Sequence, residues 1–546
     1  MYHIGSAPII MELLLYSLGI LTAVLMAILV AQRCSFTLKV ERPLVNEIHL
    51  STVSNRLLAA LPRSVLLPSD RTEFRKSIDA YWAQQEREIV PEAIVQPRDA
   101  EELARAIVII KEEYDIRQTR SANKTEDDLF AIRGGGQSPI SGAASTKGIL
   151  IDLNSLREVT ISDDKQSVVL GAGLRWIDVS RVLEGKGLAV VGGRSSDVGV
   201  AGYTLGGGVS FFTPRFGLAC SNVLAYEVVI ASGRIVQATE TSYSDLWRAL
   251  KGGSNNFGII TRFTVRCFPS TKIWSGFLYA PGSQSVKALV ALHNSVNRSD
   301  PKTSSASVDP NAAGAIACFT YVQALGIQVV TVHLAHTKPA QDLREWPSFW
   351  KSSGFATLWR FWSTFKTHTI TSATMEVNAT SPPGQRWSFG TTTIKNDLPT
   401  MIAAREAHEG AIRSLREVKG LIWTIVMQPL LPSWAAIGDP NPLGIHDSTD
   451  DPLLIVSFSV YWRLPKDDKC VDKIIRETIE KIDTIAKARG TEHPYRYLNY
   501  CSKWQQPFEG YGEENLRFLR GVSRDYDPDG LFQRGCQGGF KLGLQE

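Results

Sequence analysis

The sequence predicts a globular α+β protein, on three observations. The 546 residues are 44% hydrophobic and 21% charged, which is typical of a folded chain and excludes wholesale disorder. Residues 130–268 alternate short apolar runs with many glycines, as strands joined by tight turns do. Amphipathic helical patterns lie on both sides of that region. At roughly 100–200 residues per domain, the length indicates about three to five domain-sized units.

The charge balance and the cysteines exclude several classes of protein. Lys and Arg total 59 against 55 for Asp and Glu, a net charge of +4 without a run of five like charges, so we expect no nucleic-acid partner. None of the seven cysteines forms a CxxC pair, which argues against a zinc site but leaves room for one or two disulfides. His333 and His336 lie in a strand-like run and would face opposite sides of a sheet, so we expect no metal site.

An apolar segment near the amino terminus predicts a membrane helix. Residues 13–31 carry no charge, and their length of 19 residues matches a spanning helix. The alternative is a cleaved secretion signal, which needs a basic lead and small residues before the cleavage point. Here only His3 leads, and Leu29 stands two positions before Ala31. We therefore expect an anchor in an endomembrane rather than a secreted protein.

Two signals disagree on the side of the membrane. Basic residues follow the apolar segment, and the positive-inside rule then places the body of the protein in the cytoplasm. Three glycosylation sequons, which begin at Asn123, Asn297 and Asn378, are instead typical of a glycoprotein. Three sequons arise easily by chance in this length, so the side stays open.

Helices and strands can be assigned along the chain from periodicity. Asp99 and Glu102 have capping-box spacing before an apolar stripe, which predicts a helix from Asp99. Residues 223–238 predict a hairpin that turns at Ser232-Gly233. Further strands are expected at 148–153, 167–170, 188–191, 257–268, 329–334 and 453–462. Further helices are expected at 285–294, 400–415, 471–489 and 513–526.

The common catalytic and nucleotide motifs are missing. No GxGxxG follows a strand, and the chain contains no GxxxxGK[ST], HExxH or GxSxG. The sequence therefore predicts neither a Rossmann dinucleotide site nor a hydrolase triad.

Two glycine clusters carry the functional signal. The first, Arg133-Gly134-Gly135-Gly136-Gln137-Ser138, follows an apolar run, and its backbone N–H groups could converge on a pyrophosphate without a lysine. The second runs from residue 192 to 208, and so bare a backbone suits close contact with a large planar ligand. A tight surface turn is the alternative for the first cluster alone. Together they predict a long ligand with a diphosphate and a ring system.

The clusters and five further segments resemble the flavoprotein superfamily of vanillyl-alcohol oxidase and p-cresol methylhydroxylase. Within it, the chain is most similar to the berberine-bridge-enzyme-like oxidases, notably fungal ones of secondary metabolism. The resemblance covers residues 85–270 and returns at 490–541. The matching segments, in the family's order, are 130–144, 192–212, 245–261, 497–500, 511–515, 526–528 and 538–541.

The resemblance implies a two-lobed α+β fold, with a PCMH-type FAD-binding lobe and an antiparallel-sheet substrate lobe that covers the flavin. The first loop would cradle the pyrophosphate, and the second would lie along the flavin. The expected divisions are 1–35 for the anchor or signal, 36–84 for a lead-in, 85–270 for the FAD-binding domain, 271–470 for the substrate domain and 471–546 for a segment that returns to the FAD lobe. The cofactor-binding residues so implied are Arg133, Gly134, Gly135, Gly136, Gln137, Ser138, Gly193, Ser195, Asp197, Gly199, Gly202, Gly258, Ile260 and Asn499.

The sequence departs from the family at both positions that tether the flavin. Many members use a His at the end of the first loop, where this chain has Gln137, and some add a Cys in the second, where it has Ser195. A carboxamide and a hydroxyl are poor nucleophiles toward a flavin. We therefore predict non-covalent FAD with a lowered redox potential.

The chemistry implied is oxidation of a lipophilic small metabolite by hydride transfer to FAD, with O₂ as the probable final acceptor. Tyr497 and Tyr461 are the candidate bases, and Asn499 is expected beside the flavin and the substrate. Phe458 and Trp462 would be apolar walls or core, and Arg194 and Asp197 a local ion pair. A cyclase that keeps FAD without net redox is the first alternative, and a binding or chaperone-like membrane protein that has lost FAD is the second. The oligomeric state is unknown.

Overall fold

The computed structural model describes residues 50–120, 129–270, 272–305, 307–340, 345–536 and 538–543. Residues 50–546 form one compact unit. The predicted apolar helix at 13–31 and the sequon at Asn123 lie outside the described residues. Within those ranges, no helix is both long and apolar enough to cross a bilayer.

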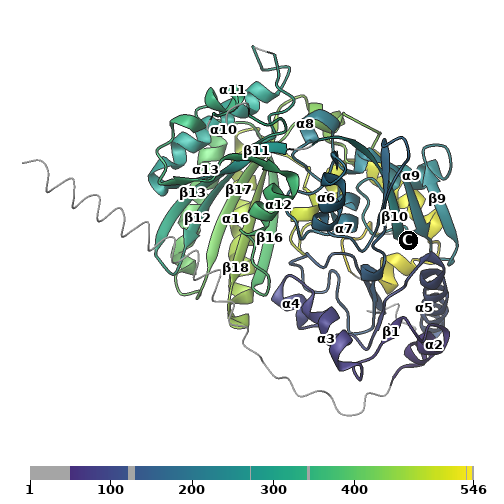
Figure 1. The fold of residues 1–546 in the computed structure, drawn as a ribbon. Coiled ribbons are helices and arrows are strands. Elements are labelled where there is room, and N and C mark those ends of the chain that lie inside the picture. Colours follow the sequence, from purple (N-terminus) through teal and green to yellow (C-terminus); the bar gives the residue numbers. More distant parts are fainter. Residues whose placement is uncertain are drawn as a thin grey trace, which may run out of the picture. The chain divides into compact units, whose positions relative to one another are not determined.

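A four-stranded sheet opens the described chain (Figure 1). Its order is β1-β2-β4-β3, in which β2, β4 and β3 are parallel and β1 is antiparallel to β2. The predicted helix from Asp99 is α5, and Asp99 Oδ1 accepts the Glu102 N–H at 2.8 Å, as an N-cap residue does. The elements are α2 (Thr52–Ala60), β1 (Val65–Leu66), α3 (Arg71–Asp79), α4 (Gln84–Arg87), β2 (Ala93–Val95), α5 (Ala100–Arg120), β3 (Phe130–Arg133) and β4 (Ile149–Asp152).

A six-stranded antiparallel sheet follows, in the order β5-β6-β10-β8-β9 with β7 beside β10. The predicted hairpin is β8–β9, and Gly233 supplies the positive φ of 78° at its turn. The elements are β5 (Val159–Ile161), β6 (Ser167–Gly171), α6 (Trp176–Glu184), β7 (Leu188–Val190), α7 (Val200–Leu205), α8 (Thr213–Phe216), β8 (Val223–Val229), β9 (Ile235–Thr239), α9 (Ser244–Ala249) and β10 (Ile259–Pro269).

The third sheet has nine strands, all paired antiparallel, in the order β14-β11-β13-β12-β17-β18-β16-β19 with β15 beside β11. One of its faces packs on helices α10, α13 and α16. The strands are β11 (Lys272–Pro281), β12 (Ile316–Val322), β13 (Ile327–His336), β14 (Trp362–Ser363), β15 (Lys366–Thr369), β16 (Arg386–Lys395), β17 (Ile422–Leu430), β18 (Leu453–Trp462) and β19 (Glu492–His493). The helices are α10 (Ser285–Ser299), α11 (Ser348–Lys351), α12 (Ile370–Asn378), α13 (Leu398–Leu415), α14 (Pro432–Ala435), α15 (Ile445–Ser448) and α16 (Asp468–Ala488).

The end of the chain returns to the first two sheets. α16 stays with the large sheet, because Val471, Ile475 and Ile479 lie in its core. From Tyr495 onward the buried residues join the core of the smaller sheets, so the return begins there rather than at Val471. The predicted last helix is α17 (Glu513–Tyr526), between the short helical turns η6 (Leu498–Tyr500) and η7 (Pro507–Tyr511) on one side and η8 (Leu531–Gly535) on the other.

The described residues therefore form two lobes with separate cores. The first lobe consists of the two smaller sheets and residues 495–543, and the second of the large sheet and its helices. The ends of β17 and β18 reach into the first core through Leu430, Leu453 and Ile455. No disulfide joins the cysteines within the described ranges.

Candidate functional site

The first glycine loop starts from a buried ion pair. Arg133 ends β3, and its Nη2 lies 2.6 Å from Asp152 Oδ2 at the end of β4, with both side chains at most 3% exposed. The guanidinium also lies over the Tyr81 ring, 4.3 Å from its centroid. Because parallel neighbours end at the same edge of a sheet, this pair fixes the point at which the loop leaves the sheet.

The loop turns its carbonyl groups toward the protein. Gly136 O accepts the Trp82 N–H at 3.0 Å, and Gly135 O accepts Arg175 Nη2 at 3.2 Å. By contrast, the backbone N–H groups of residues 134–138 have no acceptor among the described residues, and neither has the Gln137 carboxamide. A row of unused N–H groups is the donor set that an anion such as a diphosphate needs.

The second glycine loop touches the first. A Cβ atom on Gly135 would lie 2.4 Å from Gly199 Cα, and one on Gly199 would lie 2.5 Å from Gly135 N and Cα. A Cβ on Gly193 would lie 2.5 Å from Trp176 Cδ1. Gly202 in α7, in contrast, has nothing within 4 Å of that position. The glycines at 135, 193 and 199 are therefore required by close packing, whereas Gly202 leaves open space.

Asn378, at the end of α12, holds the middle of the second loop. Its Oδ1 accepts the Ser195 hydroxyl at 2.7 Å, and its Nδ2 donates to Asp197 Oδ2 at 2.8 Å. The amide of this sequon is thus used inside the fold. The same contacts correct the expected Arg194–Asp197 ion pair, because Asp197 bonds Asn378 while Arg194 points elsewhere.

Arg194 reaches from the second loop to the large sheet. Its Nη2 donates to Gln428 Oε1 on β17 at 2.7 Å and to the Tyr500 hydroxyl at 3.2 Å. Gln428 is 1% exposed, and its Nε2 has no partner among the described residues. The hydroxyl of Tyr203, in α7, is buried without a described partner as well. Arg194 therefore joins both lobes in a cluster of polar groups that still have hydrogen bonds to make.

Tyr497 and Asn499 adjoin this cluster and bond to each other. The Tyr497 hydroxyl accepts Asn499 Nδ2 at 3.1 Å and the Val209 N–H at 3.2 Å, and its ring packs edge-on against Tyr500, 4.8 Å away. Burial raises the pKa of Tyr497 above its usual range. Its proton stays on the oxygen at neutral pH and, with both acceptor positions in use, can be donated.

Tyr461 lies in a different part of the interlobe region. Its ring packs on Trp387, 4.6 Å away, which in turn stacks on Trp82 of the first lobe at 4.4 Å. Burial raises the pKa of Tyr461 to about 12. On the opposite face of β18, Phe458 and Trp462 belong to the helix-packed core. They are core residues rather than walls of a site.

Gly258 and Ile260, which the resemblance implies as cofactor-binding residues, lie at the start of β10. Ile260 is 2% exposed and pairs with Val228 of β8, so its side chain is core. A Cβ on the preceding Gly258 would lie 2.7 Å from Val228 Cγ1. Beside them, Asn256 Nδ2 donates to Phe540 O of the carboxyl-terminal segment at 3.0 Å. The structure thus brings the segment around residue 258 next to the carboxyl-terminal segment around residue 540.

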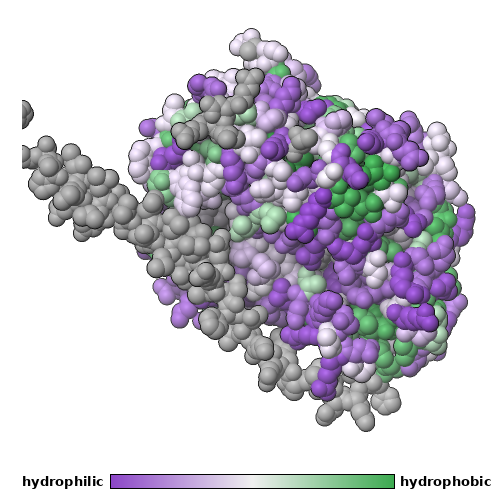
Figure 2. Space-filling model, viewed as in Figure 1, coloured by the Kyte–Doolittle hydropathy of each residue, from purple (hydrophilic) through white to green (hydrophobic). Residues whose placement is uncertain are grey.

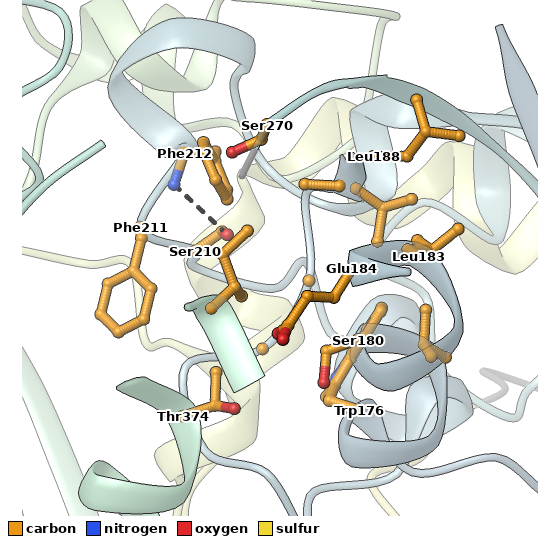
Figure 3. A pocket seen from close by; sticks show the side chains of 16 residues that line it. Trp176, Ser180, Leu183, Glu184, Leu188, Ser210, Phe211, Phe212, Ser270 and Thr374 are labelled. Carbon is orange, nitrogen blue, oxygen red and sulfur yellow. Dashed lines mark hydrogen bonds between the residues drawn. The ribbon is translucent and has the colours of Figure 1, made fainter. Parts of the chain in front are cut away.

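A small apolar pocket adjoins the second loop (Figure 3). In Figure 3, Trp176 and Ser180 project from α6, Thr374 from α12, and the Phe212 N–H donates to Ser210 Oγ at 3.3 Å. On α6 itself, Val182 is 42% exposed. Figure 2 shows apolar surface on this face of the molecule. The pocket is lined by Trp176, Val179, Ser180, Leu183, Glu184, Leu188, Ala189, Val190, Gly192, Gly193, Ser210, Phe211, Phe212, Ser270, Ile370 and Thr374.

The two histidines on β13 lie on opposite faces of the strand and have different surroundings. His333 is buried, stacks on Phe211 at 5.5 Å, and packs against Phe277. His336 faces the other side of the strand and bonds Asp309 at 3.1 Å. Within the described ranges, no group of three potential ligands could hold a metal ion.

Four residues of the interlobe region were not predicted as functional. Gln428 is the one amide in the apolar run of β17, and this isolated polar residue was the only sequence signal that it might be functional. Tyr203 and Tyr500 lay inside segments that were recognised for their glycines and for Tyr497. Asn378 was visible only as a sequon. None could be assigned from sequence, because each partner is distant along the chain.

These features fit FAD. The unused N–H row suits a diphosphate, and the bare second loop suits a ring system.

Comparison with known proteins agrees. Residues 91–239 match the family model described as an FAD binding domain. A protein named FAD-dependent monooxygenase tpcD, of Cochliobolus heterostrophus, is 33% identical over 85% of this chain and 87% of its own length. The relative shows the family, since the identity extends over both lobes.

Solved structures show the same fold. BBE-like 1 of Physcomitrella patens superposes with a TM-score of 0.69 at 18% identity, covering 91% of this chain and 100% of its own. Glucooligosaccharide oxidase of Acremonium strictum, whose FAD is 6-S-cysteinyl and 8α-N1-histidyl, gives 0.68 at 18% identity, covering 90% and 100%. The chain therefore belongs to the family of FAD-linked oxidoreductases that includes the fungal FAD-dependent monooxygenases, and it has the fold of the berberine-bridge-enzyme-like structures.

Proposed function

We propose that this enzyme binds FAD without a covalent link and oxidises a lipophilic small metabolite, with O₂ as the final electron acceptor. The observation that carries the proposal is the contact of the two glycine loops beside the Arg194 cluster between the lobes. FAD, when bound, supplies the acceptor for a hydride from a substrate C–H bond.

The absence of a tether follows from chemistry at two positions. Gln137, at the end of the first loop, carries a carboxamide, and Ser195 carries a hydroxyl that already donates to Asn378. Neither group is a thiolate or an imidazole, which are the nucleophiles that form flavin links in the Acremonium enzyme. The residues proposed to hold the cofactor are then those of the first loop, Ser195–Gly202, Gly258, Ile260 and Asn499.

The protein's own groups would orient the substrate and hold its proton. Tyr497 keeps its proton at neutral pH, so it acts first as a hydrogen-bond donor to a substrate oxygen. Asn499 fixes the Tyr497 hydroxyl through its 3.1 Å bond. Tyr461 makes no described contact with this cluster and has the weaker claim to be a base. The apolar pocket that adjoins Gly192 and Gly193 supports a lipophilic substrate.

The first test is a visible spectrum of the purified protein before and after acid precipitation. We expect a yellow supernatant over a white pellet. A yellow pellet would contradict the untethered flavin, and a colourless protein that takes up no added FAD would contradict the cofactor. Substrate oxidation is then checked by bleaching of the flavin band without oxygen and by hydrogen peroxide release on admitting air.

The replacement of both tethering residues, by Gln137 and Ser195, also favours a second candidate. This is a cyclase in which FAD forms a wall of the pocket and no net redox reaction occurs. Substrate turnover without flavin bleaching under anaerobic conditions would support it. The relatives are named as FAD-dependent enzymes, which argues against a binding protein without FAD. Membrane anchoring by residues 13–31 stays a prediction from sequence, and release of a variant lacking residues 1–35 from membranes would test it.

A further inference from the structure

In the polar cluster around Arg194, several hydrogen-bond donors have no acceptor within the described chain. A guanidinium has five N–H groups, and both hydrogens of Arg194 Nη2 are used by Gln428 and Tyr500. Its Nη1 and Nε groups have no acceptor among the described residues. Gln428 Nε2 and the Tyr203 hydroxyl are buried without partners. Each of these groups can donate a hydrogen bond to a ligand. No carboxylate of the described chain is recorded as an acceptor for any of them.

The charges around Arg194 also favour an acidic ligand. No carboxylate of the described chain lies within ion-pair distance of Arg194, although Asp197 stands three residues later. Arg194 contributes a positive charge that acts on the buried Tyr203, Tyr497 and Cys318. The Arg194 guanidinium is thus held by two neutral acceptors and has no counter-charge within ion-pair distance in the described structure.

The position of Arg194 suits contact with a substrate. It follows Gly193, which lines the apolar pocket, and it precedes Ser195, at the second tether position. Phe211 lines that pocket and stacks on His333 of the large sheet, and the charge of Arg194 acts on that buried histidine. A ligand lying there can place an apolar body against the pocket and an oxygen at Arg194.

We infer that Arg194, with Gln428, Tyr203 and Tyr497, binds an acidic oxygen of the substrate, so that the enzyme prefers metabolites with an ionised carboxyl, enol or phenol beside a lipophilic body. This inference rests on the proposed function, because it names the substrate class of the same site. Arg194 is the specificity-determining residue, since it carries the charge. A carboxylate on a guanidinium forms short, charge-assisted bonds that a neutral amide cannot reproduce.

The test compares a charged and a neutral probe of one shape on the FAD-loaded enzyme. 2-Naphthoate and 2-naphthamide are titrated while the visible flavin band is followed. We expect naphthoate to bind on the order of 10- to 100-fold more tightly than naphthamide, which corresponds to hydrogen bonds with charged groups. The preference should be constant from pH 6 to 9, because a guanidinium stays protonated throughout.

Three variants connect the preference to Arg194. R194Q should lose it, with naphthoate affinity reduced on the order of 10- to 100-fold and naphthamide affinity within about threefold. R194K should keep part of it, because the charge remains without the fork. R215Q is the matched control, since Arg215 also lacks a described ion-pair partner and lies over Phe216. It should bind both probes as the parent enzyme does.

The outcomes separate this inference from the proposed function. A protein without FAD, or one whose flavin no metabolite bleaches, fails the proposed function. A yellow holoenzyme that binds the two probes equally, or that binds neither, overturns the inference about Arg194 alone. The inference is also overturned if R194Q retains the preference, or if it changes the FAD affinity and flavin spectrum while leaving the preference intact, since the guanidinium would then serve the cofactor.

Discussion

Gly135 and Gly199 lie back to back, so that a Cβ atom on either would come within 2.5 Å of the other's backbone. This contact joins the two glycine loops, which are distant in sequence. It separates glycines that the fold requires from glycines that only a ligand would require. Gly202, with open space around its Cβ position, belongs to the second kind.

A pair of alanine variants tests that distinction. G199A should destabilise the FAD-free protein by about 1–3 kcal/mol through overpacking, and it should lower FAD affinity as the loops separate. G202A should leave the FAD-free protein as stable or more stable, because alanine favours a helix, yet weaken FAD binding if the flavin lies against α7. Urea unfolding and FAD fluorescence titration measure the two effects. Wild-type FAD affinity in G202A would remove Gly202 from the cofactor site.

A restored nucleophile should restore the tether. In Q137H an imidazole replaces the carboxamide at the end of the first loop, and we expect part of the flavin to remain in the pellet after acid precipitation. The redox potential of that fraction should rise. Q137A is the control and should release all its flavin. If Q137H does so as well, Gln137 does not lie beside the reactive methyl of the flavin.

Glu86 should make stability depend on pH. Burial raises its pKa to about 7, and its Oε1 accepts the Ala143 N–H at 3.2 Å while Oε2 has no described partner. Between pH 4.5 and 7 the folded protein holds a proton that the unfolded chain has lost, so the stabilisation is complete below pH 4.5 and declines up to about pH 7. The decline amounts to about 3 kcal/mol at 1.36 kcal/mol for each pH unit.

The measurement is the difference in unfolding free energy between wild type and E86Q at several pH values, since the subtraction removes the other titrating groups. This difference should favour wild type at pH 4.5 and fall toward pH 7. E73Q, at the exposed Lys76–Glu73 pair, should remain within about 0.5 kcal/mol of wild type throughout. A difference between wild type and E86Q that does not vary with pH would show that Glu86 is ionised in the fold.

Two tyrosines should respond differently to loss of their hydroxyl groups. Y497F removes the acceptor of the Val209 N–H and of Asn499, next to Arg194, and should reduce kcat/KM by about 100-fold or more. Y461F keeps the ring packed against Trp387 and should stay within about threefold of wild type. The assay uses the first metabolite that bleaches the flavin. Equal losses in both variants would place Tyr461 at the reacting atoms.

Local sequence patterns predicted helices and strands well, but they could not predict hydrogen bonds between residues that are distant in sequence. The cap at Asp99, the turn at Gly233 and the helix Glu513–Tyr526 depend on neighbours a few residues apart, which a single sequence displays. Arg194 and Gln428 are separated by 234 positions, and Ser195 and Asn378 by 183. Their pairing depends on how the second loop meets β17 and α12, so the sequence suggested a local Arg194–Asp197 pair instead.

The return of residues 495–543 to the first lobe determines when that lobe can be completed. The core residues Leu519 and Phe532, and the Asp529 carbonyl that accepts the Tyr114 hydroxyl at 2.8 Å, are made after the whole second lobe. A ribosome adding about 5–20 residues per second needs on the order of 15–50 s between Pro269 and the end of this segment. During that interval the emerging chain carries a first-lobe core that lacks its last buried residues.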